Sequence, residues 1–345
     1  MLGEKQINEI REHLEKAQNP LFYFDNDQDG IASYLILRRY LERGNGFAVK
    51  SSPMGEDYLR RVDEVNPDYI FILDQPEVTG EFFEELRKFN VPVVWIDHHE
   101  IDFSKIPSWV NYYNPFFEGK DKSEPTSSLC YSVTRRKEDL WLLIVGCISD
   151  RFIPEEYGGF LEKYPELGID ADDPFEIFYE SDIGKIARMI GAGLKDRTTN
   201  VVKMMRFLVD VKTPFEVLEE VRGNHEMHEK FREINDRYNK IMSKAKSEVG
   251  VSNVLFFKYS GQTSMSADLA NGLSHLYPNK IIVVVFVRGS RVNVSMRGKH
   301  IRNKVLEILS EISMATGGGH EHAVGAQFYS EDLDRFEEMV RKEFS

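Results

Sequence analysis

Residues 20–30 read PLFYFDNDQDG, and this stretch sets the pattern for the first half of the chain. Its first five residues are apolar and aromatic, as in a buried strand, and helical periodicity follows at 30–43. The alternation continues, with strands predicted at 47–52, 69–73 and 93–96 and helices at 54–65 and 79–89. Short links between such elements predict an α/β fold with a mainly parallel sheet and helices on both faces. Ligands of such sheets bind at the carboxyl ends of the strands.

The turn after the first strand carries three carboxylates at alternate positions, Asp25, Asp27 and Asp29. Crowded carboxylates repel one another unless a cation neutralises them. The same spacing opens a calcium-binding EF-hand loop, which needs a glutamate at its twelfth position and an entering helix. The twelfth position here is Ile36 and the entering segment reads as a strand, which excludes the EF-hand. A metal site and a solvated acidic turn remain as the two interpretations.

In the first half of the chain, several more side chains that can bind a metal come at the ends of apolar segments. They are, in chain order, Asp74, Asp97, His98, His99 and Asp150. A lone aspartate in such a place is more often a cap or a turn residue. Carboxylates that end three different elements of one α/β unit are harder to explain in that way, and we expect them to meet at one edge of the sheet. Oxygen-rich sites with one or two imidazoles suit Mn²⁺ or Mg²⁺ better than zinc.

The second half begins with a long helical region. Its last part, Asn224–Val249, has a single apolar stripe, which predicts one long helix that connects two domains. A second α/β unit follows, with strands predicted at 254–258, 280–287 and 291–296 and helices at 267–276, 301–312 and 330–344. The predicted organisation is a first domain at 1–222, a linker helix at 223–249 and a second, smaller domain at 250–345.

Two features of the second unit are suited to binding anions. The first is the run TGGGHEHA, with Gly317, Gly318, Gly319 and His320. Successive glycines let backbone amides approach an anion closely, and the histidine adds a ring donor; a flexible loop is the alternative interpretation. The second is Ser295-Met296-Arg297 at a strand end. Alternation places Ser295 and Arg297 on one face, where the guanidinium would bind a phosphate with two hydrogen bonds.

Charge is unevenly distributed along the chain. The net charge of −13 argues against a protein that coats duplex DNA by bulk electrostatics. Leu269–Leu306, however, contains no acidic residue. The cations in it are Lys280, Arg288, Arg291, Arg297, Lys299, Arg302 and Lys304. This acid-free segment, set in strand-forming sequence, favours a surface that holds phosphates over a merely solvated face.

Composition narrows the class of protein further. Apolar residues make up 41% and charged residues 29% of the 345 residues, an ordinary globular balance. No run approaches the roughly 18 apolar residues of a membrane span, and the charged N-terminus does not resemble a signal peptide. The two cysteines, Cys130 and Cys147, have no neighbouring ligands and form neither a zinc site nor a disulfide framework. These features predict a cytoplasmic protein without a membrane partner.

The ordered set of motifs resembles the DHH phosphoesterase family with its associated C-terminal domain. The resemblance covers nearly the whole chain and implies a site for two metal ions, usually Mn²⁺, in a cleft between two domains. By position it implies the metal ligands Asp27, Asp29, Asp74, His98 and Asp150, with Asp74 as the bridge. It implies catalytic roles for Asp97, His99 and Arg297, and substrate contacts for Ser295, Arg297, Gly317, Gly318, Gly319 and His320.

One departure separates the branches of this family. Some branches have a histidine four residues before the first aspartate of the Asp-x-Asp pair, where this chain has Tyr23. Asp25 resembles instead the extra acidic residue of the RecJ-like branch, and we count it as a sixth candidate ligand. The resemblance therefore favours RecJ-like single-strand nucleases of the archaeal type over the pyrophosphatase and exopolyphosphatase branches.

The expected function is a Mn²⁺- or Mg²⁺-dependent exonuclease on single-stranded DNA or RNA, with a 3′→5′ direction favoured. The alternative is an oligoribonuclease or nucleotide phosphatase that acts on short oligonucleotides, cyclic dinucleotides or 3′-phosphoadenosine 5′-phosphate. A non-catalytic scaffold is disfavoured, because every metal-competent position is present. The candidate protein partners are further copies of this chain and replication or repair proteins. The helical stretch 152–222 is interpreted as a substrate-guiding or oligomer-forming insertion.

Overall fold

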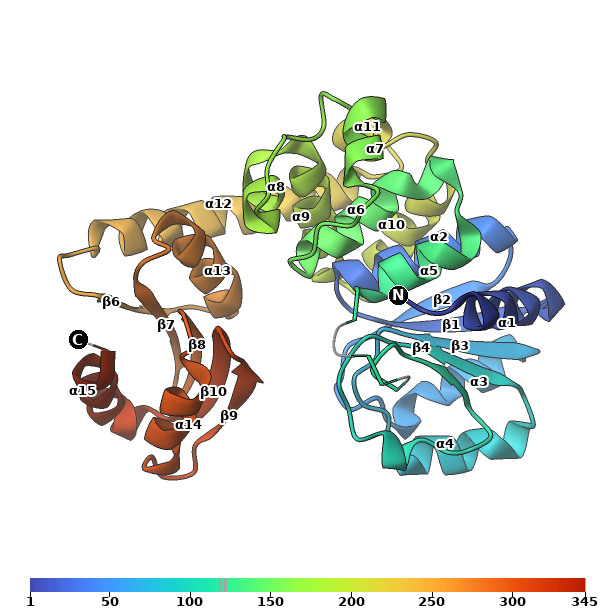
Figure 1. Cartoon of the computed structure of the whole chain (residues 1–345). Helices are drawn as coiled ribbons and strands as arrows, with labels where there is room; N and C mark the ends of the chain where they lie inside the picture. The colour runs from blue at the N-terminus through green and yellow to red at the C-terminus, as the bar shows by residue number, and fades with distance from the viewer. Residues whose placement is uncertain (118, 121–122, 345) are drawn as a thin grey trace. The chain divides into compact units, whose positions relative to one another are not determined.

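The computed structural model describes residues 1–117, 119–120 and 123–344. The chain divides into two compact units, Met1–Phe231 and Arg232–Ser345 (Figure 1). The division falls within α12 (His225–Ser247), a helix of 23 residues in the region where the sequence predicts a linker. Each unit has its own sheet and its own buried core, so each is described by itself.

The first unit is built on a five-stranded sheet with the order β2-β1-β3-β4-β5. The strands are β1 (Pro20–Asp25), β2 (Asn45–Val49), β3 (Tyr69–Leu73), β4 (Val93–Ile96) and β5 (Asn111–Tyr113). Every pairing is parallel, which confirms the predicted sheet type. The register pairs Phe24 with Leu73 and Leu73 with Ile96, so the central strands end side by side. The residues that follow these strands therefore meet at one edge.

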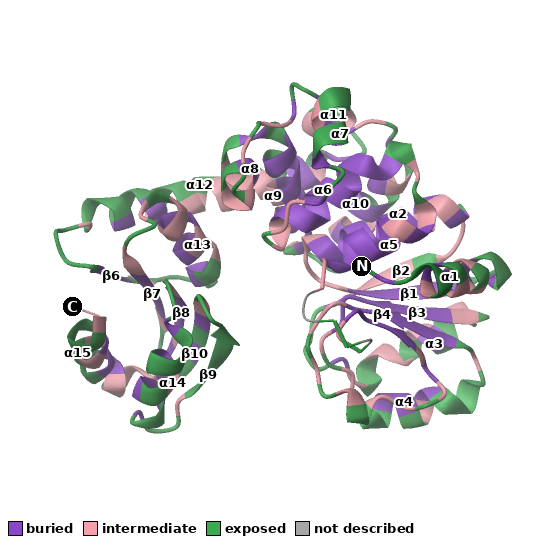
Figure 2. Cartoon of the chain, in the orientation of Figure 1, coloured by how far each residue is buried: buried purple, intermediate pink, exposed green. Residues whose placement is uncertain are grey.

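Helices cover both faces of this sheet, as expected (Figure 1). On one face lie α1 (Glu4–Lys16), α2 (Gln28–Leu41), α5 (Thr126–Thr134) and α6 (Leu140–Ser149). On the other face lie α3 (Arg60–Val65) and α4 (Gly80–Leu86). Alternate residues of β1 enter different cores: Phe22 and Phe24 pack with the first group, and Leu21 and Tyr23 with the second. Figure 2 shows that α2, α5 and α6 are buried along much of their length, whereas α4 keeps an exposed outer face.

In the first unit, two predicted elements differ from the structure, and one strand, β5, was not predicted. The strand predicted at 47–52 is observed at Asn45–Val49, because it pairs with β1 residue by residue and ends where β1 ends. The helix predicted at 54–65 is interrupted: Met54 forms a bridge with Val78, and only a 3-10 turn, η1 (Glu56–Tyr58), precedes α3. The short strand β5 carries no clear pattern and is defined by its pairing with β4.

The helical region of the first unit packs onto the α2–α6 side. Its helices are α7 (Tyr157–Lys163), α8 (Pro174–Glu180), α9 (Asp182–Leu194), α10 (Thr198–Asp210) and α11 (Phe215–Leu218). The first unit also contains the 3-10 turns η2 (Arg87–Phe89), η3 (Phe103–Lys105) and η4 (Lys137–Asp139), and the second unit contains η5 (Ser330–Asp332). Buried residues of α9 and α10, such as Ile190 and Met204, share one core with α2 and α6. Among the described residues, no helix has both the length and the apolar character that crossing a membrane requires.

Arg39 of α2 forms a buried ion pair with Asp139 of η4 and hydrogen bonds with carbonyls at the end of α10. The Arg39 Nε donates to Asp139 Oδ1 at 2.6 Å, and Arg39 Nη1 donates to the carbonyl of Val211 at 2.6 Å. Both side chains are almost fully buried, at 6% and 0% exposed. Removing one partner of such a pair leaves a buried charge without compensation, which costs about 3–5 kcal/mol.

We therefore expect Arg39→Met to lower the free energy of unfolding by about 3–5 kcal/mol. Arg38→Met is the matched control, because Arg38 is only half-buried and donates one hydrogen bond, to the Gly44 carbonyl. Its loss should cost about 1 kcal/mol. Urea unfolding of both variants measures the difference, and equal losses would contradict the structural role given to the buried pair.

The second unit has a mixed five-stranded sheet with the order β6-β7-β8-β10-β9. Its strands are β6 (Val254–Ser260), β7 (Ile281–Arg288), β8 (Arg291–Arg297), β9 (Thr316–His320) and β10 (Ala323–Tyr329). Only β6 and β7 pair in parallel. One face packs against α13 (Ser266–Leu276), and the other against α14 (Arg302–Ser310) and α15 (Leu333–Phe344). The last two strands, β9 and β10, were not predicted.

Candidate metal centre

The carboxyl ends of β1, β3 and β4 supply the first acidic residues of the site. Asp25 ends β1, and Asp74 and Asp97 directly follow β3 and β4. Asp74 has a φ of 61°, in the left-handed region where aspartate and asparagine are tolerated better than most residues. Its amide donates to the carbonyl of Ile96 at 3.0 Å, which ties the turn to the neighbouring strand.

The acidic turn between β1 and α2 is held in a tight conformation. Asp27 is the N-cap of α2, and its carboxylate accepts from the Gly30 amide at 2.9 Å. A β-carbon on Gly30 would lie 2.4 Å from the Asp25 carbonyl oxygen, so only glycine fits there. The motif is thus a built turn that aims carboxylates, rather than a freely solvated one.

Ligand atoms of these residues converge in three overlapping groups. Within each group the atoms lie within 4.8 Å of one another. The groups are Asp25, Asp27 and Asp74; Asp74, His98 and His99; and Asp29, His98 and Asp150. The Nε2 of His98 lies 3.4 Å from Asp74 Oδ1 and 3.2 Å from Asp150 Oδ2. The structure therefore brings together all six residues predicted as ligands, with Asp74 and His98 each shared by two groups.

Asp29 is held differently from the other carboxylates. It is fully buried, and the N-terminus of α5 donates to it: the Thr126 amide at 2.7 Å, the Ser127 amide at 3.0 Å and the Ser127 hydroxyl. The Thr126 hydroxyl also donates to Asp74 Oδ1 at 3.0 Å. The prediction from the sequence missed Thr126 and Ser127. The only local signal is a proline followed by small hydroxyl residues, which is typical of a helix N-terminus.

His99 is positioned by a buried polar network. Its Nδ1 lies 2.8 Å from Asp97 Oδ1, and Asp97 also accepts from the Tyr112 hydroxyl at 3.1 Å and from the Asn114 amide at 3.3 Å. Burial opposes the charged imidazole, but the hydrogen bond and charge of Asp97 outweigh it and raise the pKa of His99 to about 9. Asp97 thus contacts His99, in keeping with a positioning role. Tyr112 and Asn114 carried no signal in the sequence.

Loss of the hydrogen bonds around Asp97 should disturb the orientation of the His99 ring, although the imidazole itself stays in the protein. We expect Asp97→Asn to lower kcat about 10- to 100-fold, the range for a residue that orients a ligand or catalytic group. Tyr112→Phe removes only one hydrogen bond to Asp97 and should have a smaller effect. Rates of phosphodiester hydrolysis at saturating Mn²⁺ measure both, and an unchanged kcat in Asp97→Asn would contradict the role of the network.

The positive charge of His99 faces the clustered carboxylates. Burial and the charge of Asp27 raise the pKa of Asp25 to about 6. Burial and the charges of Asp29 and Asp27 raise the pKa of Asp74 well above its usual range. Among the described residues, no lysine or arginine forms an ion pair with Asp25, Asp27 or Asp74. An oxygen-rich donor set with one or two imidazoles fits a divalent cation such as Mn²⁺ or Mg²⁺.

The predicted substrate residues lie in the second unit. Ser295 and Arg297 face α13, as alternation predicts: the Ser295 hydroxyl donates to Ser266 at 3.1 Å, and the Arg297 Nε donates to Asn271 Oδ1 at 2.6 Å. Arg297 Nη1 also donates to the Met296 carbonyl at 2.7 Å. These contacts fix the guanidinium at the end of β8.

The glycine run is an exposed edge strand rather than a loop. Gly317, Gly318 and Gly319 belong to β9 and pair with β10. Gly319 has a φ of 145°, and a β-carbon there would lie 2.1 Å from the Ala323 carbonyl oxygen. His320 ends this strand and is exposed. The glycines therefore serve a close backbone approach within a hairpin, and the strand leaves an exposed edge.

Some cations of the acid-free segment Leu269–Leu306 already have partners outside the segment. Lys304 pairs with Glu343 of α15 at 2.6 Å, and Lys280 donates to the carbonyls of Gly250 and Ser252. Acidic and carbonyl groups from outside the segment thus neutralise or occupy some of its cations. The predicted phosphate-holding surface is correspondingly narrower.

Two family models match the chain. The model of the DHH family, N-terminal domain, matches residues 21–148, and the DHHA1 domain matches residues 239–345. The chain belongs to the DHH family. It is a phosphoesterase of this family, which places it among the metal-dependent hydrolases. The first matched segment contains every candidate ligand except Asp150, and the second contains Ser295, Arg297 and the glycine strand.

Solved structures share the fold of this DHH protein at low sequence identity. RecJ of Thermus thermophilus, solved with Mn²⁺, has a TM-score of 0.68 and 16% identity over 99% of this chain and 55% of its own. The chain thus spans about half the length of that RecJ, which has also been solved with Mg²⁺. A pGpG-specific phosphodiesterase from Vibrio cholerae has a TM-score of 0.54 and 14% identity over 95% of this chain and 99% of its own.

CDC45 from Entamoeba histolytica also shares the fold, with a TM-score of 0.53 and 10% identity over 99% of this chain and 98% of its own. A comparison with curated proteins finds no match. Identities this low show the fold alone. The particular substrate of this DHH protein has to be argued from its own residues.

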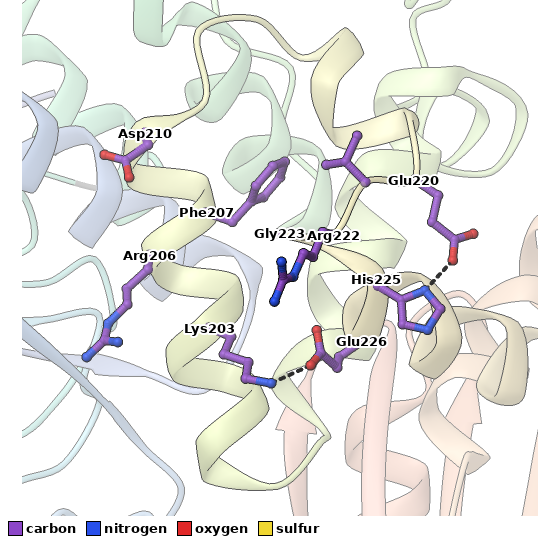
Figure 3. A pocket seen from close by; sticks show the side chains of 10 residues that line it. Lys203, Arg206, Phe207, Asp210, Glu220, Arg222, Gly223, His225 and Glu226 are labelled. Carbon is purple, nitrogen blue, oxygen red and sulfur yellow. Dashed lines mark hydrogen bonds and ion pairs between the residues drawn. The ribbon is translucent and has the colours of Figure 1, made fainter.

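A separate hollow of ≈ 1230 Å³ in the first unit lies between α10 and the segment that leads into α12 (Figure 3). It is lined by Lys203, Arg206, Phe207, Asp210, Glu220, Val221, Arg222, Gly223, His225 and Glu226. Lys203 pairs with Glu226, and His225 with Glu220 at 2.6 Å. Because its charges largely cancel and no candidate metal ligand lines it, this hollow is not assigned to the hydrolytic site.

Proposed function

We propose that this DHH protein is a divalent-metal-dependent exonuclease that hydrolyses single-stranded DNA or RNA, with a 3′→5′ direction favoured. The observation that carries the proposal is the set of three overlapping ligand groups, in which Asp74 and His98 are each shared by two groups. Within the part of the chain that the structure describes, no lysine or arginine pairs with Asp25, Asp27 or Asp74. Two cations would neutralise carboxylates such as Asp25 and Asp74, whose pKa values are raised by burial and by the neighbouring carboxylates.

The residues divide naturally between two ions. Asp25, Asp27 and Asp74 would hold one, and Asp29, His98 and Asp150 the other. Asp74 Oδ1 lies 3.4 Å from His98 Nε2 of the second group. Bound divalent ions of this kind polarise a phosphoryl oxygen and lower the pKa of water. Asp29 keeps lone pairs for a metal although α5 donates to it, because a carboxylate has about four acceptor positions.

The other residues act on the substrate phosphate. His99, held by Asp97, supplies a charged donor that would stabilise negative charge as it develops on the phosphate oxygens. Arg297, fixed by Asn271, would bind a substrate phosphate from the DHHA1 domain. The RecJ structures solved with Mn²⁺ and with Mg²⁺ support the choice of metal.

A second candidate is a phosphodiesterase for dinucleotides or other small nucleotides. The observation that favours it is the fold shared with the pGpG-specific phosphodiesterase, which this chain matches over 99% of that protein's length. The metal centre would be the same in both candidates, and only the preferred length of substrate differs.

The test compares kcat/KM on a single-stranded 20-mer, a dinucleotide and 3′-phosphoadenosine 5′-phosphate in Mn²⁺. A nuclease should prefer the 20-mer, and end-labelled strands then report the direction of digestion. A preference for the dinucleotide would move the protein to the second candidate. Inactivity on all three in the presence of Mn²⁺ would overturn both.

A further inference from the structure

An aromatic surface is built on α8, in the helical region of the first unit. Phe175 and Tyr179 are one helical turn apart, and their rings are 6.3 Å apart between centroids with 10° between planes. Phe178 packs edge-on against Tyr179 at 5.2 Å. All three rings are only partly buried, so part of the aromatic surface faces solvent.

Two arginines are stacked against these rings. The guanidinium of Arg151 lies 4.6 Å from the centroid of Phe175, and that of Arg188 lies 5.8 Å from the centroids of Phe178 and Tyr179. Arg188 also donates a hydrogen bond to the Phe178 carbonyl. Cation–π contacts of this kind fix the orientation of the rings. The aromatic surface is therefore a built feature rather than a set of loose side chains.

Arg151 connects this surface to the metal centre. It directly follows Asp150, so the two α-carbons are about 3.8 Å apart. Arg151 has a φ of 60°, in the turn that ends α6, where the Phe152 amide donates to the Cys147 carbonyl at 2.9 Å. Consecutive residues thus act in two places: the Asp150 carboxylate lies 3.2 Å from His98 Nε2, and the Arg151 guanidinium lies over Phe175.

The charges around the rings indicate what could bind there. Two acidic residues, Glu176 of α8 and Asp173 at its N-cap, are exposed. They would repel a phosphate backbone that ran along the helix. A nucleobase carries no such charge, and aromatic rings and guanidinium planes are the groups on which unpaired bases stack. The surface is therefore suited to one base at the end of a strand, not to a continuing chain of phosphates.

We infer that Arg151, Phe175 and Tyr179 form a stacking subsite for the terminal nucleobase next to the scissile phosphate. This inference rests on the proposed function and adds a role for the helical region that the DHH and DHHA1 matches leave out. Stacking depends on the flat face of a base and not on its hydrogen-bond donors and acceptors, so the subsite accepts any base. It makes the end of a single strand, or one half of a dinucleotide, the preferred occupant.

The experiment measures kcat/KM in Mn²⁺ on short single strands whose 3′- or 5′-terminal nucleotide is either intact or abasic. The wild-type protein should prefer the intact terminus by about tenfold to a hundredfold at the end from which it digests. Phe175→Leu and Tyr179→Leu keep apolar packing but remove a ring, and should abolish most of this preference while cleaving the abasic strand at the wild-type rate. Thermal unfolding checks that both variants fold.

Phe207→Leu is the matched control, because Phe207 is a half-buried ring on α10 of the same unit and lies beside Gly223. It should leave the preference unchanged. Equal slowing of intact and abasic strands by the α8 variants would show a structural role and overturn the subsite. Equal cleavage of both strands by the wild-type protein would overturn the subsite alone. A wild-type protein that cleaves no nucleotide substrate would overturn the proposed function and the subsite with it.

Discussion

Asp74→Asn should abolish hydrolysis while making the metal-free protein more stable. The variant keeps the shape of the side chain and tolerates the φ of 61°, but it removes the carboxylate shared by two ligand groups. We expect kcat to fall about a thousandfold or more, since the loss of a single preorganised electrostatic contact already costs about 10²–10³.

The gain in stability follows from the raised pKa of Asp74. The folded protein holds this carboxyl at a pKa well above the 3.8 of the unfolded chain, so it binds more protons than the unfolded state and loses stability as pH rises above 3.8. Asp74→Asn has no carboxyl at this position and does not lose stability in this way. The metal-free variant should therefore be more stable than the wild-type protein at neutral pH, and the difference should shrink as pH falls toward 4.

Thermal unfolding in chelator at pH 7 and pH 4, together with activity in Mn²⁺, measures both effects. Asp25→Asn is the informative comparison, because Asp25 is half-buried and its carboxylate also accepts from Gln75 at 3.3 Å. An equal loss of activity would make Asp25 a ligand, whereas a mild loss would leave it as a neighbour of the metal. Retention of activity by Asp74→Asn would contradict the shared-ligand role.

Arg297→Ala should weaken substrate binding about 10- to 100-fold, the loss expected for a charged hydrogen bond to phosphate, without changing metal affinity. The reason is its place in the DHHA1 domain, where Asn271 and the Met296 carbonyl hold the guanidinium. Arg291→Ala is the matched control, since Arg291 begins the same strand and lies over the ring of Tyr329 at 5.0 Å. It should have a small effect.

The measurement is a titration of Asp74→Asn protein with strands of two to twenty nucleotides at several salt concentrations, with and without the arginine substitutions. The acid-free segment should add a salt-dependent gain for longer strands, although Lys304 is already paired with Glu343. If Arg297→Ala left the affinity for the strands unchanged, Arg297 would not be a substrate-binding residue. Affinity independent of both length and salt would favour the small-nucleotide candidate.

Much of the metal centre could be predicted because its residues end strands. Asp25, Asp74 and His98 follow apolar runs, and parallel strands bring their carboxyl ends to one edge whatever the details of packing. The network around these residues could not be predicted in this way. Ser127 reaches Asp29 across 98 residues of chain, so its role exists only in the tertiary structure.

The fold shows the same limit in two short elements. β5 is three residues long and is recognisable only through its pairing with β4. β9 contains three successive glycines, which strands normally disfavour, and it persists because β10 pairs with it along its whole length. Long periodic elements such as α12, in contrast, could be predicted from the spacing of their apolar residues.

The number of divalent ions that each chain needs for activity tests the central claim most directly. Protein stripped with chelator should be inactive, and calorimetric titration with Mn²⁺ should show two ions per chain, with hydrolysis recovering as the second ion binds. Asp74→Asn should bind less than this and remain inactive. Full activity after exhaustive chelation, with no ion bound, would contradict the claim that hydrolysis depends on two metal ions.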